Sequence, residues 1–452
     1  MVVNVDVLLS LHRERFDVAV IGAGVLGVTV SYWLSVLFNC SVALIEQESD
    51  VAVHSSSRNT GVIHRPFYLD PLKKKIFAGA SQKSFFLWKS LASRYSLSWN
   101  EVGTLEVANS DSDISVLEKF RGWSTLNGIL DEEIDILDSK EVSRVEPMVS
   151  CMGALFSKTD VSVSFKEFTE TVQKLVVKNG VKFLNNMCVE DVVEDGKGVE
   201  VKLKSSGETS FLECDFLINV AGGESIDIAH MVGVAKEYTD LHFRGEYWLV
   251  DEPFASKISH NVYSVPKQKD FPFLDPHFIV KYDGARQLGP NAVLVFGPKV
   301  YQGISNSVSE FLYKIFERPI TPKINLGFNR KFLSLIWSEW RSSLSKGGMC
   351  DRVSKFIPAL ESDMLSVRGL SGVRSSVIDA KGIVPEALQV YSDKSVNVLN
   401  YNSPGATGAP SYSAFIVANL IERGYLDHLS KKSQDVRESI WSFEDACVIG
   451  CD

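Results

Sequence analysis

The sequence predicts an α/β fold of two domains, one built on a buried parallel sheet and one on mixed antiparallel strands. At 452 residues the chain is too long for one simple core. Residues 18–21 form a β-branched strand that leads at once into a glycine turn and an apolar helix, which is how a parallel sheet begins. From about 236 to 330, aromatic and polar residues alternate and Pro and Gly are frequent, which indicates antiparallel strands.

The predicted elements follow one another along the whole chain. The first strand leads to a helix at 25–37 and a second strand at 41–45. Residues 199–204 alternate strictly between apolar and polar, and a Ser-Ser-Gly turn joins them to a partner strand, so a small antiparallel meander is expected. It is followed by a separate buried strand at 216–220. We expect further helices at 71–91, 113–127, 165–179, 330–346, 350–357 and 411–422, and further strands at 98–108, 153–157, 181–183, 188–193, 210–214, 369–384 and 396–401.

Two N-terminal segments have a membrane-related alternative. Residues 18–38 carry no charge, and that length would satisfy a membrane span. The glycines at 22 and 24 divide the run into a strand and a helix, which favours a buried sheet-and-helix unit. Residues 1–9 are apolar, but the charges follow them and no small-residue cleavage site is present, so we expect an extra strand or an amphipathic lead-in rather than a signal peptide.

Composition limits the classes of partner. Apolar residues make up 45% of the chain and charged residues 23%, which is an ordinary globular balance. A formal net charge of −9 argues against nucleic acid, because phosphate binding needs a concentrated basic face. The seven cysteines show no C-x-x-C spacing, which fits a reducing compartment and predicts neither a metal site nor a disulfide framework.

The glycine turn has the spacing Gly22-x-Gly24-x-x-Gly27. The first glycine permits the tight turn, the second lets the backbone approach a pyrophosphate, and the third lets the helix pack close to the strand. The helix N-terminus then stabilises the phosphate charge. Glu46 ends the second strand, 24 positions after Gly22, where a carboxylate can accept both ribose hydroxyls of an adenosine. This combination predicts a dinucleotide site but leaves FAD and NAD open.

The loop at 54–64 reads His-Ser-Ser-Ser-Arg-Asn-Thr-Gly-Val-Ile-His. It resembles the loop of glycerol-3-phosphate oxidases and L-2-hydroxyglutarate dehydrogenases, in the D-amino-acid-oxidase (DAO) family, that lies beneath the FAD pyrophosphate. Gly372-Val373-Arg374 and the segment 402–407, Asn-Ser-Pro-Gly-Ala-Thr, are similar to elements that lie over the flavin and at its pyrimidine edge in this family. The L-2-hydroxyglutarate dehydrogenase branch is the best match.

The resemblance implies FAD as cofactor and a fold with a Rossmann-type FAD-binding domain and an antiparallel-sheet substrate domain. The FAD domain would be discontinuous, at 12–95, 150–235 and 362–430, with a substrate or cap domain at 96–149 and 236–361 and terminal extensions at 1–11 and 431–452. The expected cofactor-binding residues are Gly22, Gly24, Gly27, Glu46, Gln47, Ser55, Ser56, Arg58, Asn59, Thr60, Val189, Ala221, Gly222, Gly372, Pro404, Gly405, Ala406 and Thr407.

Two residues are expected to act on the substrate. By resemblance His64 would face the substrate beside the flavin, and an imidazole can take a hydroxyl proton near neutral pH while hydride passes to flavin N5. Arg374 would bind the anionic group of the substrate, because a guanidinium pairs bidentately with a carboxylate. The implied reaction is oxidation of an L-2-hydroxy acid, with L-2-hydroxyglutarate as the best candidate.

Two departures from the family pattern fall where substrate recognition is expected. Arg65 follows His64 where small residues are usual, and Ser375 and Ser376 replace the Ala-Gln that typically follows the arginine. Arg65 is therefore either a second anion contact or a residue that points away. Glycerol-3-phosphate oxidation and oxidation of an N-methyl or D-amino acid stay open, as does a non-enzymatic dinucleotide-binding or membrane-anchored structural protein. The electron acceptor stays open among quinone, a soluble carrier and oxygen. We expect a cytoplasmic protein, with peripheral association at the inner face of a membrane left open.

Overall fold

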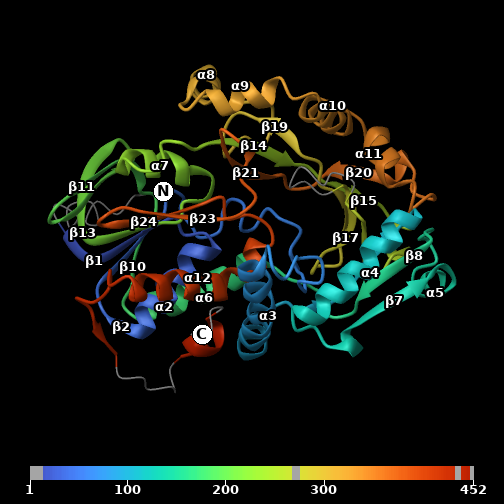
Figure 1. Ribbon diagram of the computed structural model, residues 1–452, viewed down its shortest axis with the longest axis horizontal. Coiled ribbons are helices and arrows are strands. Elements are labelled where there is room, and N and C mark those ends of the chain that lie inside the picture. The colour runs from blue at the N-terminus through green and yellow to red at the C-terminus, as the bar shows by residue number, and fades with distance from the viewer. Residues whose placement is uncertain (1–13, 267–274, 433–438, 448–452) are drawn as a thin grey trace.

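Two eight-stranded sheets lie at opposite ends of the long axis of the molecule (Figure 1). The computed structural model describes residues 14–266, 275–432 and 439–447, so the predicted N-terminal strand or lead-in lies outside the described residues. The first sheet has a parallel centre in the order β10 (Lys182–Leu184), β3 (Val42–Ile45), β1 (Glu14–Ile21), β13 (Glu208–Asn219) and β24 (Ser395–Leu399). The antiparallel strands β11 (Cys188–Asp195), β12 (Gly198–Ser205) and β23 (Leu388–Tyr391) extend it.

The prediction of two strands at 210–214 and 216–220 is wrong, because β13 is one strand of 12 residues. No glycine or proline interrupts it, and its register with β1 continues from Phe16 opposite Cys214 to Val18 opposite Phe216. Its first part alternates between exposed and buried residues as the meander requires, and its last four residues are buried. The first part of β13 therefore belongs to the antiparallel meander, which is partly exposed to solvent, and its last part belongs to the buried parallel centre of the sheet.

Four helices cover one face of this sheet. They are α2 (Val25–Leu37), α3 (Lys75–Tyr95), α6 (Phe165–Lys178) and α12 (Gly405–Glu422), and their core includes the fully buried Trp33, Trp88 and Phe168. On the other face Ile228 of α7 (Ser225–Val232) packs against strand residues such as Ala19 and Ile21. The uncharged run at 18–38 is therefore a buried strand, turn and helix, and none of the helices of the described residues is long and apolar enough to span a bilayer.

The second sheet is mostly antiparallel and lies at the other end of the long axis, on the right in Figure 1. Its order is β20 (Leu365–Arg368), β15 (Trp248–Val250), β18 (Arg286–Gly289), β17 (His277–Val280), β16 (Asn261–Ser264), β6 (Thr104–Ala108), β8 (Gly153–Ser157) and β7 (Ile134–Asp138). Helices α4 (Asp111–Leu126), α5 (Ser139–Val145) and α11 (Lys346–Val353) pack beside it. Because both β8 and β20 belong to this sheet, we propose that the substrate domain extends to about residue 157 and resumes until about residue 371.

Smaller sheets join the two halves. One contains β19 (Val293–Val295), β14 (Thr239–Gly245), β21 (Gly372–Asp379) and β22 (Gly382–Ile383), and another β4 (Val62–Ile63), β9 (Val161–Ser162) and β5 (Asn100–Glu101). A last pair, β2 (Phe38–Asn39) and β25 (Ser430–Lys431), fastens the C-terminal segment to the end of α2.

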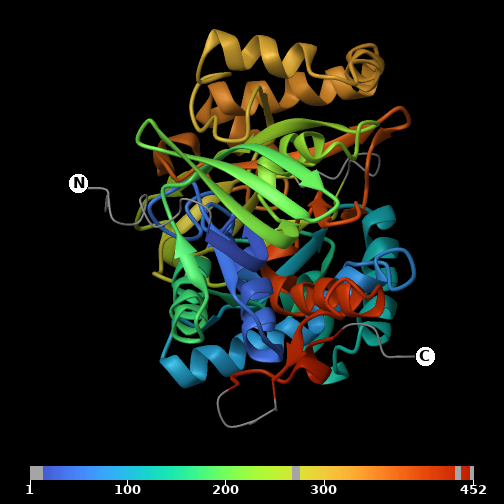
Figure 2. The same cartoon turned by 90° about the vertical axis from the view of Figure 1, so that its left-hand side faces the viewer.

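The prediction of antiparallel strands up to residue 330 fails after β19. Two helices, α8 (Val308–Phe316) and α9 (Thr321–Gly327), lie there instead, and α10 (Arg330–Leu344) then confirms the helix predicted at 330–346. Local capping explains two of them, since Ser307 accepts a hydrogen bond from the amide of Glu310, and Asn329 accepts from the amides of Lys331 and Phe332. The helices lie at the same end of the molecule in two perpendicular views (Figures 1 and 2).

Candidate active site

One cavity of about 760 Å³ lies between the two sheets and is lined by the ends of β1 and β3, by β6, β16 and β17 of the second sheet, and by β21. This volume falls within the roughly 300–1,000 Å³ of typical ligand sites. The predicted residues that line it are Gly22, Gly24, Glu46, Gln47, Ser55, Ser56, Arg58, Asn59, Thr60, His64, Val189, Ala221, Gly222, Gly372, Arg374, Pro404, Gly405, Ala406 and Thr407. Gly27 alone of the predicted set is not part of the lining.

Two glycines of the turn are required by close backbone contacts. Gly22 has φ +101°, and a Cβ there would lie 2.8 Å from the backbone of Val220 and Ala221. A Cβ on Gly27 would lie 1.8 Å from the carbonyl oxygen of Gly22, so this glycine lets α2 approach β1 without itself touching a ligand. The amide of Val25, at the first turn of α2, donates to Ser56 Oγ at 3.0 Å. The N-terminus of α2 therefore borders the cavity beside the loop at 54–64.

The end of the cavity next to β3 is polar. Glu46 accepts hydrogen bonds from the amides of Ala23 (2.8 Å) and Glu48 (2.9 Å), and burial raises the pKa of its carboxyl. Gln47 donates to Glu224 at 2.7 Å and accepts from Lys299 at 2.7 Å. With Val189, Ala221 and Gly222 these residues line the end of the cavity where we expect the adenosine of a dinucleotide to lie.

The loop at 54–60 is held by its own side chains. Asn59 donates to the carbonyls of Ser55 and Ser56 and accepts from the amide of Gly61 at 2.8 Å. Arg58 donates to the carbonyl of Val53 at 3.0 Å and lies over the ring of Tyr301 at 4.0 Å. A Cβ on Gly372 would lie 2.1 Å from the carbonyl oxygen of Arg58, so β21 crosses the loop in close contact. The loop is thereby fixed between the first sheet and β21.

His64 forms a hydrogen-bonded pair with Asp160, a residue that the sequence analysis did not identify. His64 Nδ1 lies 2.8 Å from Asp160 Oδ2, and its Nε2 lies 3.2 Å from the hydroxyl of Tyr263. Asp160 is completely buried and also accepts from Thr104, Ser157 and the amide of Arg65, at 2.6–3.0 Å. A carboxylate with these donors favours the tautomer with a proton on Nδ1, which leaves Nε2 to accept a proton from a ligand.

Arg374 lies on β21, opposite Phe243 of β14, and lines the same cavity as His64. Burial lowers the pKa of its guanidinium to about 10, so it is still cationic at neutral pH. Tyr68 lies among the charged groups of this end, since Asp160, Glu106 and Arg374 all influence the pKa of its phenol, which burial raises. The end of the cavity opposite Glu46 therefore has the guanidinium of Arg374 and two imidazoles, those of His64 and His277.

Glu106 is a second residue that the sequence analysis missed. It lies on β6, is 6% exposed and lines the cavity. Burial and the nearby Asp160 raise the pKa of its carboxyl to about 8, so the neutral acid predominates at pH 7. A lone acidic residue in the otherwise uncharged strand Thr-Leu-Glu-Val-Ala is the signal that could have identified it. Asp160 had no such signal, because it lies in a turn ahead of β9.

Arg65 points away from the cavity, which decides between the two interpretations of this departure. It is completely buried, and its guanidinium donates to both carboxylate oxygens of Glu133 at 2.7 and 2.9 Å. It also lies 4.4 Å from the ring centre of Phe85. Ser375 does line the cavity, but its hydroxyl lies 2.7 Å from Nδ1 of the buried His242. Arg65 therefore joins the substrate half to α3 and is not an anion contact.

The glycine turn and the cavity beside it are typical of a dinucleotide-binding protein, and comparison with known families makes the class specific. The family model of FAD-dependent oxidoreductases, DAO, matches residues 17–420, so the chain belongs to this family. It is an FAD-dependent enzyme with an α/β fold, as the sequence predicts.

Two relatives and one solved structure illustrate the match. The chain is 28% identical over 426 residues to the mitochondrial L-2-hydroxyglutarate dehydrogenase of Caenorhabditis briggsae, covering 92% of this chain and 95% of that one. It is 26% identical over 409 residues to the L-2-hydroxyglutarate dehydrogenase of Escherichia coli, covering 90% and 93%. The FAD-bound L-α-glycerophosphate oxidase of Mycoplasma pneumoniae has the same fold, with a TM-score of 0.69, 21% identity and coverage of 93% and 97%.

The residues present fit FAD. The N-termini of α2 and α12 both border the cavity, and neither helix has a side-chain cap from its own N-cap residue. Helix N-termini favour anionic groups, as a pyrophosphate or a reduced flavin would present. Thr407 donates to the carbonyl of Val62 and accepts from the amide of His64, so the start of α12 is hydrogen-bonded to β4 and to the residue that follows it. When bound, FAD supplies the hydride acceptor of the reaction.

Proposed function

We propose that this enzyme oxidises an L-2-hydroxy acid, with L-2-hydroxyglutarate as the best candidate, to the 2-oxo acid. The observation that carries the proposal is the His64–Asp160 pair in one cavity with Arg374. Oxidation of a secondary alcohol needs a base for the hydroxyl proton, and an imidazole oriented by a buried carboxylate is such a base. The names of the relatives support the same substrate class.

Each side chain has a separate role in this proposal. His64 Nε2 takes the hydroxyl proton, and Asp160 stabilises the imidazolium that results. Arg374 binds the carboxylate next to the reacting carbon, because its planar fork pairs with both oxygens. Glu106, neutral below pH about 8, donates a hydrogen bond to the second carboxylate of a dicarboxylic acid. A monocarboxylic acid would leave that donor without its partner.

Anaerobic mixing with a panel of substrates tests the proposal. L-2-hydroxyglutarate should bleach the visible absorbance of the flavin, L-lactate should do so more slowly, and glycerol 3-phosphate and sarcosine should leave it unchanged. Fast bleaching by glycerol 3-phosphate would assign the alcohol base to a phosphorylated substrate. Fast bleaching by sarcosine, retained in His64→Ala, would assign amine oxidation, which needs no such base.

A further inference from the structure

One segment outside the expected cofactor-binding motifs borders the nucleotide end of the cavity. Residues 298–314, here called the strap, consist of an irregular loop after β19 and most of α8. Pro298, Lys299 and Tyr313 of the strap line the cavity. The side chain of Lys299 is also 33% exposed and Tyr313 is 53% exposed. Because these two residues meet both the cavity and the solvent, they lie at its rim.

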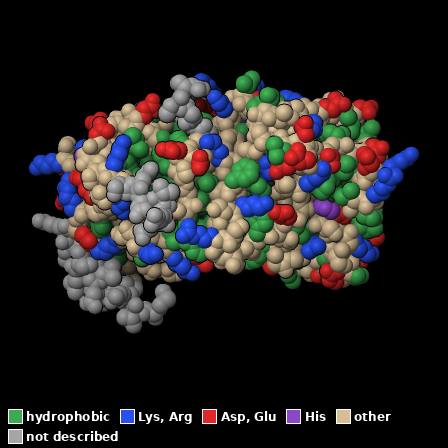
Figure 3. Space-filling view, turned by 90° about the horizontal axis from the view of Figure 1, so that it is seen from below, with side chains coloured by type: hydrophobic (Ala, Val, Ile, Leu, Met, Phe, Trp, Pro, Cys, Tyr) green, Lys and Arg blue, Asp and Glu red, His purple; other side chains and the backbone are tan. Residues whose placement is uncertain are grey.

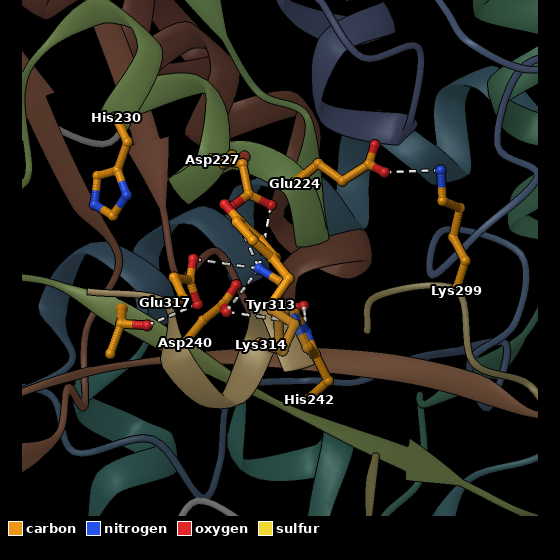
Figure 4. A network of polar contacts seen from close by, with 12 residues as sticks. Glu224, Asp227, His230, Asp240, His242, Lys299, Tyr313, Lys314 and Glu317 are labelled. Atoms are coloured by element: carbon orange, nitrogen blue, oxygen red, sulfur yellow. Dashed lines mark hydrogen bonds and ion pairs between the residues drawn. The ribbon is translucent and has the colours of Figure 1, made fainter. Parts of the chain in front are cut away.

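Lys299 connects the strap to the half of the protein built on the first sheet. Its Nζ lies 2.7 Å from Glu224, which immediately precedes α7, and 2.7 Å from the amide oxygen of Gln47 (Figure 4). Gln47 in turn donates to Glu224 at 2.7 Å. Each of these three hydrogen bonds involves a charged group, which makes it stronger than a neutral one. The three side chains thus form a closed triangle across the rim.

A second connection joins α8 to α7 (Figure 4). Lys314 Nζ lies 3.1 Å from the carboxylate of Asp227, and the hydroxyl of Tyr313 donates to the same carboxylate at 3.1 Å. Burial raises the pKa of Asp227 to about 6, so this carboxylate is mostly ionised at pH 7.5. Two donors of the strap therefore share one charged acceptor on α7.

Lys314 has further partners that do not belong to α7. Its Nζ lies 3.4 Å from Asp240 of β14 and 3.4 Å from Glu317, the residue that follows α8. Thr239 of β14 donates to Glu317 at 2.9 Å, so the C-terminal end of α8 is anchored to β14. A buried ammonium group without a partner would be strongly unfavourable. Because of these partners, α8 can separate from Asp227 without leaving the lysine unpaired.

Side chains alone connect the strap to the elements that border the other side of the rim. Among the residues that the structure describes, no backbone hydrogen bond runs from 298–314 to the glycine turn, the loop at 54–60 or α7. A third side-chain contact is that of Tyr301, whose hydroxyl lies 2.5 Å from His54 Nδ1. A segment held in this way can open locally while the sheets stay intact.

Exposed ion pairs elsewhere on the molecule give a reference for these contacts. The face seen from below in Figure 3 has Lys and Arg side chains interspersed with Asp and Glu. Exposed pairs contribute little, because water screens them. Lys89 and Glu101 form one such pair, with side chains 51% and 52% exposed. The side chains of Lys314 and Asp227 are only 5% and 21% exposed, so their contact is screened less.

We propose that the strap closes the nucleotide end of the FAD site, and that its contacts with Glu224 and Asp227 limit how fast FAD enters and leaves. A cofactor enclosed between two halves of a protein can exchange only when part of the wall moves. The strap is a part of the wall that can move, because side chains alone hold it to the other side of the rim. Neither the substrate nor His64 takes part in this role.

Release of FAD from the holoenzyme tests the proposal. A phosphodiesterase that cleaves free FAD to the more fluorescent FMN makes release visible and prevents rebinding. Glu224→Gln should release FAD about fivefold faster than the wild type. Asp227→Asn should release it about tenfold faster, because two donors lose a charged acceptor, and the double variant about 50-fold faster. Lys89→Gln is the control at an exposed pair and should release FAD at the wild-type rate.

The rate of FAD association separates closure by the strap from a direct contact with FAD. A closed wall slows entry as well as exit, so the apoenzymes of both single variants should also bind FAD faster, by a similar factor. The charge-exchanged variant Lys299→Glu/Glu224→Lys restores the ion pair and should release FAD at close to the wild-type rate. Far-UV circular dichroism shows whether each fold is kept. If Asp227→Asn does not fold, Tyr313→Phe removes one donor and should give a smaller increase.

Three results would overturn the proposal. One is equal release of FAD from the wild type and the double variant. Another is faster release without faster association, because Glu224 or Asp227 would then contact FAD itself. The third is a charge-exchanged variant that releases FAD as fast as Glu224→Gln.

Discussion

The two ends of the cavity are built by different means. At the nucleotide end, glycines, backbone amides and helix N-termini form much of the lining, and each motif is contained in one short segment, as in the glycine turn at 22–27 and the loop at 54–60. At the substrate end, side chains far apart in sequence meet: His64 and Asp160 are 96 positions apart, and Arg374 comes from a third segment. The difference teaches that cofactor binding here depends on local chain geometry, whereas the chemistry depends on tertiary pairing of ionisable groups.

The comparison predicts that changes at the substrate end alter turnover without loss of FAD. His64→Ala should lower kcat by about 10²–10⁴-fold, because it removes the base, while flavin content stays that of the wild type. Stopped-flow reduction and the absorbance of released flavin measure the two effects. His54→Ala is the control, because His54 lines the cavity but contacts Glu48 and Tyr301. A kcat of His64→Ala within twofold of wild type would contradict the role of base.

Changes at the nucleotide end should have the opposite effect. Gly27→Val would place a Cβ 1.8 Å from the carbonyl oxygen of Gly22, and overpacking of this kind destabilises by about 1–3 kcal/mol. We expect lower flavin content and a lower unfolding temperature, with near-normal turnover per bound flavin. Gly196→Val, where a Cβ would meet nothing within 4 Å, is the matched control. Full flavin content in Gly27→Val would contradict the account of this end.

The variant Arg374→Lys tests whether Arg374 binds the carboxylate of the substrate. Lysine keeps the charge but loses the bidentate fork, so kcat/KM for L-2-hydroxyglutarate should fall by about 10–100-fold, mostly through KM. Arg65→Lys is informative beside it, since Arg65 contacts Glu133 and does not line the cavity. That variant should lose stability but keep KM. A large rise of KM in Arg65→Lys and none in Arg374→Lys would reverse the assignment.

The smallest effect concerns pH. Glu106 has a pKa raised to about 8, so it is neutral below that pH and charged above it. The neutral acid can donate to a carboxylate of the substrate, and the ionised form repels it, so KM for L-2-hydroxyglutarate should rise a few-fold above pH 8. Glu106→Gln keeps a donor at every pH and should flatten this limb of the profile. A limb that persists unchanged in Glu106→Gln would belong to another group.

The difference between the two ends of the cavity also explains which of its residues could be predicted from the sequence. The glycine turn, Glu46 and the loop at 54–64 were recognisable because their function depends on spacing within one segment, and each lies at the cavity. Asp160 was not, because its partner His64 is brought to it only by the pairing of β4 with β9. Arg65 was left open for the same reason, since its partner Glu133 is remote in sequence. Helices α8 and α9 were mistaken for strands because several of their apolar residues face outward, whereas α10 was predicted as a helix.

We expect a 2-hydroxy acid to give up its C2 hydrogen in this cavity, with its hydroxyl directed at His64. The most direct measurement is anaerobic single-turnover reduction of the bound flavin by L-2-hydroxyglutarate, its C2-deuterated form and the D-enantiomer. We expect rapid bleaching by the L-acid, slower bleaching by the deuterated acid and none by the D-acid. Unchanged absorbance with the L-acid, in a preparation that glycerol 3-phosphate or sarcosine bleaches, would contradict it.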